Sequence, residues 1–152
     1  MSISARLAEL GIELPAVAAP VAAYVPAVVH GGLVYTSGQL PFTAGALPAT
    51  GKVGAAVDAN DAKGYARTCA LNALAAAADA AGGVDRIAGV LRVGGFVASV
   101  PEFSGQPGVI NGASEVLGEI FGDAGRHARA AVGVPVLPLD SPVEVEVTFI
   151  LA

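Results

Sequence analysis

The chain has few charged residues for its length of 152. Asp, Glu, Lys and Arg together make up 14% of the residues, against about 25% in an ordinary soluble domain. None of them falls between Leu14 and Gly51, and a third of the chain, 52 residues, is Ala or Gly. A lone domain with so few charges exposes apolar surface to water. We therefore expect part of this surface to be buried against copies of the same chain.

Cysteine, histidine and basic residues are also scarce. The single cysteine, Cys69, excludes an internal disulfide and is interpreted as an inert core thiol. The two histidines are separate, His30 in a predicted turn and His127 in a predicted loop, so they offer no metal-binding cluster. Eight basic residues spread along a chain of net charge −5 form no patch for nucleic acid. We expect neither a metal nor a nucleic-acid partner.

No apolar run in the sequence is long enough to span a membrane. The longest charge-free apolar segment, from Ala16 to Val29, has 14 residues and contains Pro20 and Pro26, whereas a spanning helix needs about 18. Glu9 and Glu13 interrupt the region where a secretion signal needs its apolar stretch. These features predict a cytoplasmic protein with no membrane contact.

The order of hydrophobic patterns predicts one α+β domain over residues 1–152, with residues 1–19 as an N-terminal extension. Both long helices are expected to pack on one face of a mixed sheet of five or six strands. The predicted strands are 24–29, 33–39, 89–100, 128–136 and 143–151, the first two joined by a turn at 30–32. The predicted helices are a short one from Ser2 or Ser4 to Gly11 and longer ones over about 61–81, capped by Asp58 or Asn60, and 108–121.

Arg129 stands in a predicted strand that otherwise holds Ala, Val and Gly. A charge in such a strand needs a partner, and the planar guanidinium suits a carboxylate. The sequence leaves that partner open: a ligand, an internal ion pair with Glu144 or Glu146, or water. The two glutamates alternate with valines over 143–147, so they share one face of a strand. Such a face is usually solvated, but a half-buried carboxylate near Arg129 is suited to general acid–base work.

Four further residues are candidates for lining a ligand site. Gly38 allows a ligand to approach the backbone, and Ser37 can donate a hydrogen bond. No His–Asp pair accompanies Ser37, so it is not expected to be a nucleophile, and both residues also fit an ordinary strand end. Tyr24 also fits a half-buried core aromatic, and Asn111 a residue at a helix start. Residues alone therefore indicate a self-associating α+β domain with a site for a small acid.

Taken together, these motifs resemble the RidA family, also called YjgF or reactive-intermediate deaminase, which has a chorismate-mutase-like fold. The matching segments follow in unbroken order from about Pro20 to the C-terminus. They are residues 24–28 (YVPAV), 34–41 (VYTSGQLP), 95–99 (GFVAS), 110–113 (INGA), 128–129 (AR) and 137–146 (LPLDSPVEVE).

The resemblance implies a homotrimer in which sheets pack around a threefold axis and three sites form between neighbouring chains. It also implies hydrolysis of 2-imino acids, the tautomers of enamines released by pyridoxal-phosphate enzymes, to 2-oxo acids and ammonia. No cofactor is implied. By position, Arg129 would bind the substrate carboxylate, Glu144 would orient or activate the attacking water, and the site would be lined by Tyr24, Ser37, Gly38 and Asn111.

The chain departs from the best-studied branch directly after the arginine. Ala130 and Ala131 stand where that branch carries a hydroxyl or thiol residue and then Cys or Thr. This indicates a divergent branch with a different substrate range. It also motivates a second hypothesis, a non-catalytic sensor or chaperone-like module that binds a small carboxylate. A third hypothesis, an endoribonuclease or translation inhibitor, is disfavoured by the acidic balance and by the lack of a histidine pair.

Overall fold

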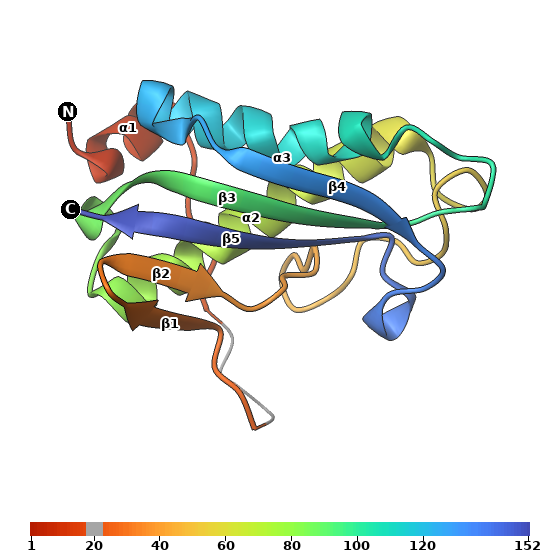
Figure 1. Ribbon diagram of the computed structural model, residues 1–152, viewed down its shortest axis with the longest axis horizontal. Coiled ribbons are helices and arrows are strands. Elements are labelled where there is room, and N and C mark those ends of the chain that lie inside the picture. The colour runs from red at the N-terminus through yellow and green to blue at the C-terminus, as the bar shows by residue number, and fades with distance from the viewer. Residues whose placement is uncertain (18–22) are drawn as a thin grey trace.

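A computed structural model describes residues 1–17 and 23–152, and it confirms the α+β class with a mixed sheet (Figure 1). Five strands form one sheet in the order β1-β2-β5-β3-β4, in which β3 and β4 are parallel and the other pairs antiparallel. Figure 1 shows α2 and α3 on one face of this sheet. The elements are α1 (Ile3–Glu9), β1 (Ala27–His30), β2 (Leu33–Thr36), α2 (Ala59–Ala81), β3 (Ile87–Ala98), α3 (Gln106–Phe121), β4 (Ala128–Val134) and β5 (Val143–Leu151), with short 3₁₀ turns at 84–86, 122–125 and 138–140.

The predicted helices and strands recur with shifted ends. α2 begins two residues earlier than expected, and the Asp58 side chain caps it by accepting hydrogen bonds from the backbone N–H groups of Asn60 and Asp61. Residues 18 and 19 of the predicted extension lie outside the described residues. Over 1–17 and 23–152, no helix combines the length and the hydrophobicity that crossing a bilayer requires.

The first hairpin is shorter than predicted. His30 pairs with Leu33, so the turn consists of Gly31 and Gly32, with φ of 58° and 79°. Positive φ at both turn positions gives the twist that a two-residue hairpin needs, and glycine adopts it without strain. The prediction that His30 is a turn residue is therefore wrong, because it ends β1. The flanking residues 24–26 and 37–39 lie outside β1 and β2.

β5 lies at the centre of the sheet and places every second side chain under the helices. Val143, Val145 and Phe149 are fully buried there. α2 covers them with small residues, among them the buried Cys69. Burial, with a smaller contribution from the charge of Glu144, raises the pKa of the Cys69 thiol well above its ordinary value. This agrees with the expectation of an inert core thiol.

α2 and α3 run side by side in the same direction and touch through a glycine. A Cβ atom built on Gly112 collides with the backbone carbonyl oxygen of Lys63. On the outer surface, Lys63 pairs with Glu115 and Arg67 pairs with Glu119, both with N–O distances of 3.1 Å. Exposed ion pairs of this kind add little stability. The close approach therefore depends on the missing side chain at position 112.

α1 docks on the rest of the domain through hydrogen bonds at its first turn. Ser2 caps the helix by accepting from the N–H of Ala5. The backbone N–H and the hydroxyl of Ser4 each donate to the Asp85 carboxylate at 2.7 Å. Arg6 Nε donates to the carbonyl of Glu119 in α3 at 3.0 Å. The predicted short helix is thus confirmed, with Ser2 rather than Ser4 as its cap.

Gly112→Ala is expected to lower the free energy of unfolding by about 2–4 kcal/mol, because a methyl group cannot fit against the Lys63 carbonyl without separating α2 from α3. Gly118→Ala is the matched control, since a Cβ at that position of the same helix meets no atom within 4 Å. The control is expected to raise stability by up to about 1 kcal/mol through helix propensity. Urea unfolding of both variants measures the difference, and equal effects would contradict the packing described.

A second prediction concerns the pH dependence of the contact between α1 and Asp85. The hydrogen bonds from Ser4 hold the pKa of the Asp85 carboxyl below its ordinary value. Their contribution to stability is therefore present above the ordinary pKa of about 3.9 and is lost as pH falls through the lower folded pKa. Amide NMR shifts in α1 should titrate in that acid range in the parent protein and in Asp79→Asn, and not in Asp85→Asn. Titration that persists in Asp85→Asn would assign the effect to another group.

Candidate functional site

Arg129 lies in the edge strand β4 and is held by α3. It pairs with Val93 of β3, whose side chain is fully buried, so both residues face the helices. Arg129 Nη1 donates to Asn111 Oδ1 at 2.8 Å and to Ser114 Oγ at 3.1 Å. Its Nη2 donates to the carbonyl of Pro107 at 3.3 Å. The structure thus brings together two predicted site residues, Arg129 and Asn111.

These bonds leave one edge of the guanidinium available. Both Nη1 hydrogens and one Nη2 hydrogen are engaged, whereas Nε donates to no residue in 1–17 or 23–152. A guanidinium has five N–H donors in a plane, and the two that remain unengaged belong to Nε and Nη2, the nitrogens that lie along one edge. Two adjacent donors match the two oxygens of a carboxylate. The alternative of an internal ion pair between Arg129 and Glu144 or Glu146 is wrong for this chain, because no such pair forms among the described residues.

Glu144 lies on the opposite, uncovered face of the sheet. It stands in β5 between the fully buried Val143 and Val145, so the strand alternation directs it away from the helices. Glu146 follows on the same face, as predicted. Partial burial, and secondly the charge of Glu146, raise the pKa of the Glu144 carboxyl above its ordinary value. Glu144 therefore takes up a proton more readily than an exposed glutamate.

Gly38 and Ser37 lie beside Glu144. A Cβ atom on Gly38 would come within 2.6 Å of Glu144 Oε1, so a side chain at this position would displace the Glu144 carboxyl. Ser37 Oγ donates to the carbonyl of Val25 at 2.7 Å, which ties the segment before β1 to the end of β2. Tyr24 in that segment is 60% exposed. It is therefore not the half-buried core aromatic that was the alternative expectation.

The predicted site residues fall into two groups that the single chain does not bring together. The arginine half consists of the predicted Arg129 and Asn111 on the helix-covered face, together with Ser114, which also holds Arg129. The glutamate half consists of Glu144 on the open face, Gly38 beside it, and Ser37 with the segment that contains Tyr24. Glu144 is in register with Phe96 of β3, which is in register with Val132, three residues beyond Arg129. Figure 1 shows β3 between β4 and β5. The two halves thus differ in strand, in register and in sheet face.

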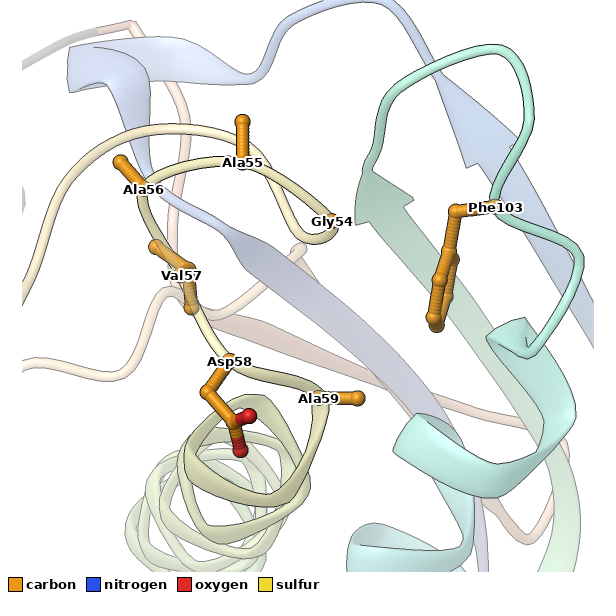
Figure 2. Close-up of a pocket in the computed structure, with 7 residues that line it drawn as sticks. All are labelled: Gly54, Ala55, Ala56, Val57, Asp58, Ala59 and Phe103. Carbon is orange, nitrogen blue, oxygen red and sulfur yellow. The ribbon is translucent and has the colours of Figure 1, made fainter.

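The hollow drawn in Figure 2 lies elsewhere. It has a volume of about 430 Å³ and lies between the turn 54–57 with the start of α2 on one side and Phe103 on the other. Asp58, its one charged lining residue, already accepts two backbone hydrogen bonds as the cap of α2. None of the lining residues is a predicted site residue. Over the described residues, no cluster of His, Cys, Asp and Glu has the composition of a metal site.

Two residues of the hydrogen-bond network around Arg129 were missed from the sequence. His127, interpreted as a loop residue, directly precedes β4, and its Nε2 lies 2.9 Å from Ser114 Oγ. Ser114 was not singled out at all. The signals were nevertheless present: His127 is two residues before Arg129, and alternate residues of an extended segment point the same way. Ser114 is three residues after Asn111, on the same face of a helix.

The raised pKa of Glu144 predicts how stability varies with pH. A carboxyl whose folded pKa is raised stabilises the fold fully below the unfolded pKa, and this contribution is lost as pH rises through the folded pKa. Glu144→Gln is therefore expected to raise the melting temperature at neutral pH by a few degrees at most, and the gain should vanish below about pH 4. Glu102→Gln, at an exposed position, is the control. An equal gain at neutral and acid pH would contradict this assignment.

Proteins with similar sequences and structures cover nearly the whole chain. Protein TCP17 of Trypanosoma cruzi is 42% identical over 145 residues, which are 95% of this chain and 91% of that protein. The crystal structure of protein Atu1372 from Agrobacterium tumefaciens has a TM-score of 0.90 and 45% identity, over 99% of this chain and 92% of that one. Escherichia coli TdcF, solved with bound serine, has a TM-score of 0.62 and 27% identity, over 90% of this chain and 94% of that one.

The family model described as "YjgF/chorismate_mutase-like, putative endoribonuclease" matches residues 4–150. The match begins within α1, whereas the motifs in the sequence indicated a resemblance only from about residue 20. Together with the fold and the relatives, it confirms the family expected from the motifs: the chain belongs to the YjgF/chorismate mutase-like family.

Proposed function

We propose that this protein hydrolyses 2-imino acids, and the enamines in equilibrium with them, to 2-oxo acids and ammonia. The observation that carries the proposal is the state of Arg129. Three of its N–H groups are held by Asn111, Ser114 and Pro107, and the Nε–Nη2 edge is left for a carboxylate. An arginine fixed in this way binds a small acid in one orientation, which sets the position of the carbon next to the carboxylate.

The chemistry requires little beyond positioning and one proton acceptor. Water adds to the carbon of the protonated imine while one water proton passes to the Glu144 carboxylate, which gives a 2-amino-2-hydroxy acid. Glu144 then returns this proton to the nitrogen, the hydroxyl proton passes to solvent, and the carbon–nitrogen bond breaks to release ammonia and the 2-oxo acid. Because the pKa of the Glu144 carboxyl is raised, it lies closer to neutral pH, which suits a group that must both take up and return a proton. No cofactor enters this scheme.

The proposal includes a homotrimer whose sites lie between neighbouring chains. The carboxylate and the imine carbon of one substrate are bonded to each other, so Arg129 and Glu144 must lie a few ångströms apart to act on it. Since they occupy opposite faces of one sheet, we assign the arginine half to one chain and the glutamate half to its neighbour. The open face supports such an assembly, because Val28, Tyr35 and Val132 on it are each about half exposed in the single chain.

The serine bound to TdcF supports the ligand class, because serine is a small molecule with a carboxylate and a nitrogen on the adjacent carbon. The endoribonuclease in the family description has less support from this chain. The two halves contain one arginine and one titratable carboxyl, and both ring nitrogens of the nearby His127 are engaged in hydrogen bonds. RNA cleavage by paired general acids and bases has no evident counterpart in this arrangement.

A binding module without turnover is the second candidate. Ala130 is in register with Gly94 and Ala131 with Gly95, so the two residues that follow Arg129 add no polar group to either face of the sheet. A site poor in polar groups holds a carboxylate but offers few partners to a departing ammonia. Binding of a 2-oxo acid that depends on Arg129, without any acceleration of imine hydrolysis, would favour this sensor function.

Substitution of Arg129 or Glu144 is expected to impair the activity in different ways. An amino-acid oxidase generates the imine, semicarbazide traps it, and a deaminase slows semicarbazone formation. Arg129→Lys should raise KM by about 10–100-fold, because lysine cannot form the bidentate contact. Glu144→Gln should lower kcat by about 10²–10⁴-fold. Arg86→Ala and Glu102→Gln, both at exposed positions, should behave as the parent. Unchanged imine lifetime with the parent protein excludes the proposed enzyme.

Mixing two inactive variants tests the assembly. If each site takes its arginine from one chain and its glutamate from the next, co-refolded Arg129→Ala and Glu144→Gln chains should regain about a quarter of the parent activity, since one neighbour pair in four is then complete. A site built within one chain regains none. Sedimentation of the parent should give a mass near three times 14.9 kDa. A monomer at assay concentration contradicts the shared site.

A further inference from the structure

A continuous line of hydrogen bonds runs from the site arginine to the backbone beside β4. Arg129 Nη1 lies 3.1 Å from Ser114 Oγ, Ser114 Oγ lies 2.9 Å from His127 Nε2, and His127 Nδ1 lies 2.6 Å from the carbonyl oxygen of Gly125. We propose that Ser114 and His127 are positioning residues that orient the Arg129 guanidinium so that its Nε–Nη2 edge receives the substrate carboxylate. This inference rests on the proposed function for the identity of the ligand.

The direction of donation follows from the two ends of the line. A carbonyl oxygen only accepts, so His127 Nδ1 must carry a proton to bond with Gly125. A guanidinium only donates, so Ser114 Oγ must accept from Arg129. In the neutral imidazole with hydrogen on Nδ1, Nε2 is an acceptor, and the Ser114 hydroxyl donates to it. Each bond in the line is then satisfied in one direction only, from Arg129 through Ser114 and His127 to Gly125.

His127 therefore controls which way the serine hydroxyl points. With its hydrogen directed to Nε2, the Ser114 oxygen presents a lone pair to Arg129 and no competing hydrogen. A serine without this histidine rotates freely among several partners, including the backbone of its own helix. The Gly125 end is rigid as well, because Gly125 is buried and a Cβ on it would come within 2.6 Å of the Leu117 carbonyl. The line thus connects Arg129 to a fixed point of the fold.

Ser114 matters for Arg129 because it engages the second hydrogen of Nη1. Asn111 alone, at 2.8 Å, leaves Nη1 with one free hydrogen that competes for the incoming carboxylate. With both Nη1 hydrogens engaged, the guanidinium offers the carboxylate only the edge formed by Nε and Nη2. The two residues act on the ligand through Arg129 and do not contact it.

The first test needs no ligand. In ¹⁵N NMR of the full-length parent protein, the His127 ring should show a protonated Nδ1 and an unprotonated Nε2. The Nη resonances of Arg129 should be resolved, because rotation of the guanidinium is slow. Ser114→Ala and His127→Asn should collapse these Nη resonances, since asparagine keeps the bond to Gly125 but cannot reach Ser114. An Nε2-protonated neutral ring, or an Arg129 signal unchanged in both variants, overturns the proposal.

The second test measures carboxylate binding with 2-oxobutanoate as the probe. Ser114→Ala and His127→Asn should each weaken its Kd by about tenfold, the effect of losing one hydrogen bond to a charged group. Ser114→Thr keeps the hydroxyl, and His127→Gln keeps a polar group at the Nε2 position, so both should restore binding to within about threefold of the parent. Ser104→Ala and His30→Gln, at exposed positions, are the matched controls and should bind as the parent does.

Steady-state kinetics distinguish a positioning role of Ser114 from a role in the reaction itself and from a role in folding. In the imine assay, Ser114→Ala should raise KM with kcat changed less than about twofold, because Arg129 holds the carboxylate equally in the ground state and the transition state. A fall in kcat at unchanged KM assigns Ser114 to the reaction itself and overturns the proposal. The proposal is also overturned if Ser114→Thr loses activity as Ser114→Ala does and both variants melt at a lower temperature, because that pattern identifies a purely structural residue.

If the parent neither binds 2-oxobutanoate nor shortens imine lifetime, the proposed function fails, while the NMR test still decides whether Ser114 and His127 orient Arg129.

Discussion

The strand at the centre of the sheet imposes the constraint on which the rest of this structure depends. β5 has two neighbours, β2 and β3, and every second residue of it is buried under α2 and α3. Because side chains alternate between the two faces of a strand, burial of the valines also fixes the face of the residues between them. A register shift by one residue would place Glu144 and Glu146 in the core instead of the valines. The burial of Val143 and Val145 is therefore what directs Glu144 to the open face. The hydrophobic core and the candidate acid–base group are set by one pattern.

The position of the arginine depends on the other side of the sheet, where α3 lies next to α2. Gly112 touches the Lys63 carbonyl, and this contact allows α3 to lie close against α2. Asn111 and Ser114, on either side of this glycine along the helix, are thereby brought over β4, where they meet Arg129. A helix interface made of small residues thus determines the geometry of a charged group that belongs to neither helix.

The separation of the two halves gives the scarcity of charge a structural meaning. The open face carries Glu144 together with exposed apolar residues, and such a face is poorly suited to water. In the assembly proposed above, covering that face and completing the site are the same event. Because the apolar face is then covered, the chain needs few charges for solubility. Two of the charges in the sheet, Arg129 and Glu144, serve the proposed site.

The sequence by itself determined the α+β class, the order of the elements, the candidate caps of the first two helices and the fact that Glu144 and Glu146 share one face, because these features depend on neighbouring residues and on periods of 2 and 3.6. It also singled out Arg129, whose charge stands out in an apolar strand. It did not reveal that Ser114 and Pro107 of α3 hold this arginine, or that His127 reaches Ser114, because α3 and the segment of β4 are brought together only by their packing. Only the tertiary structure decided that Arg129 and Glu144 occupy opposite faces. Strand order and register, which place β3 between them, arise from contacts between distant parts of the chain, and no local pattern records those contacts.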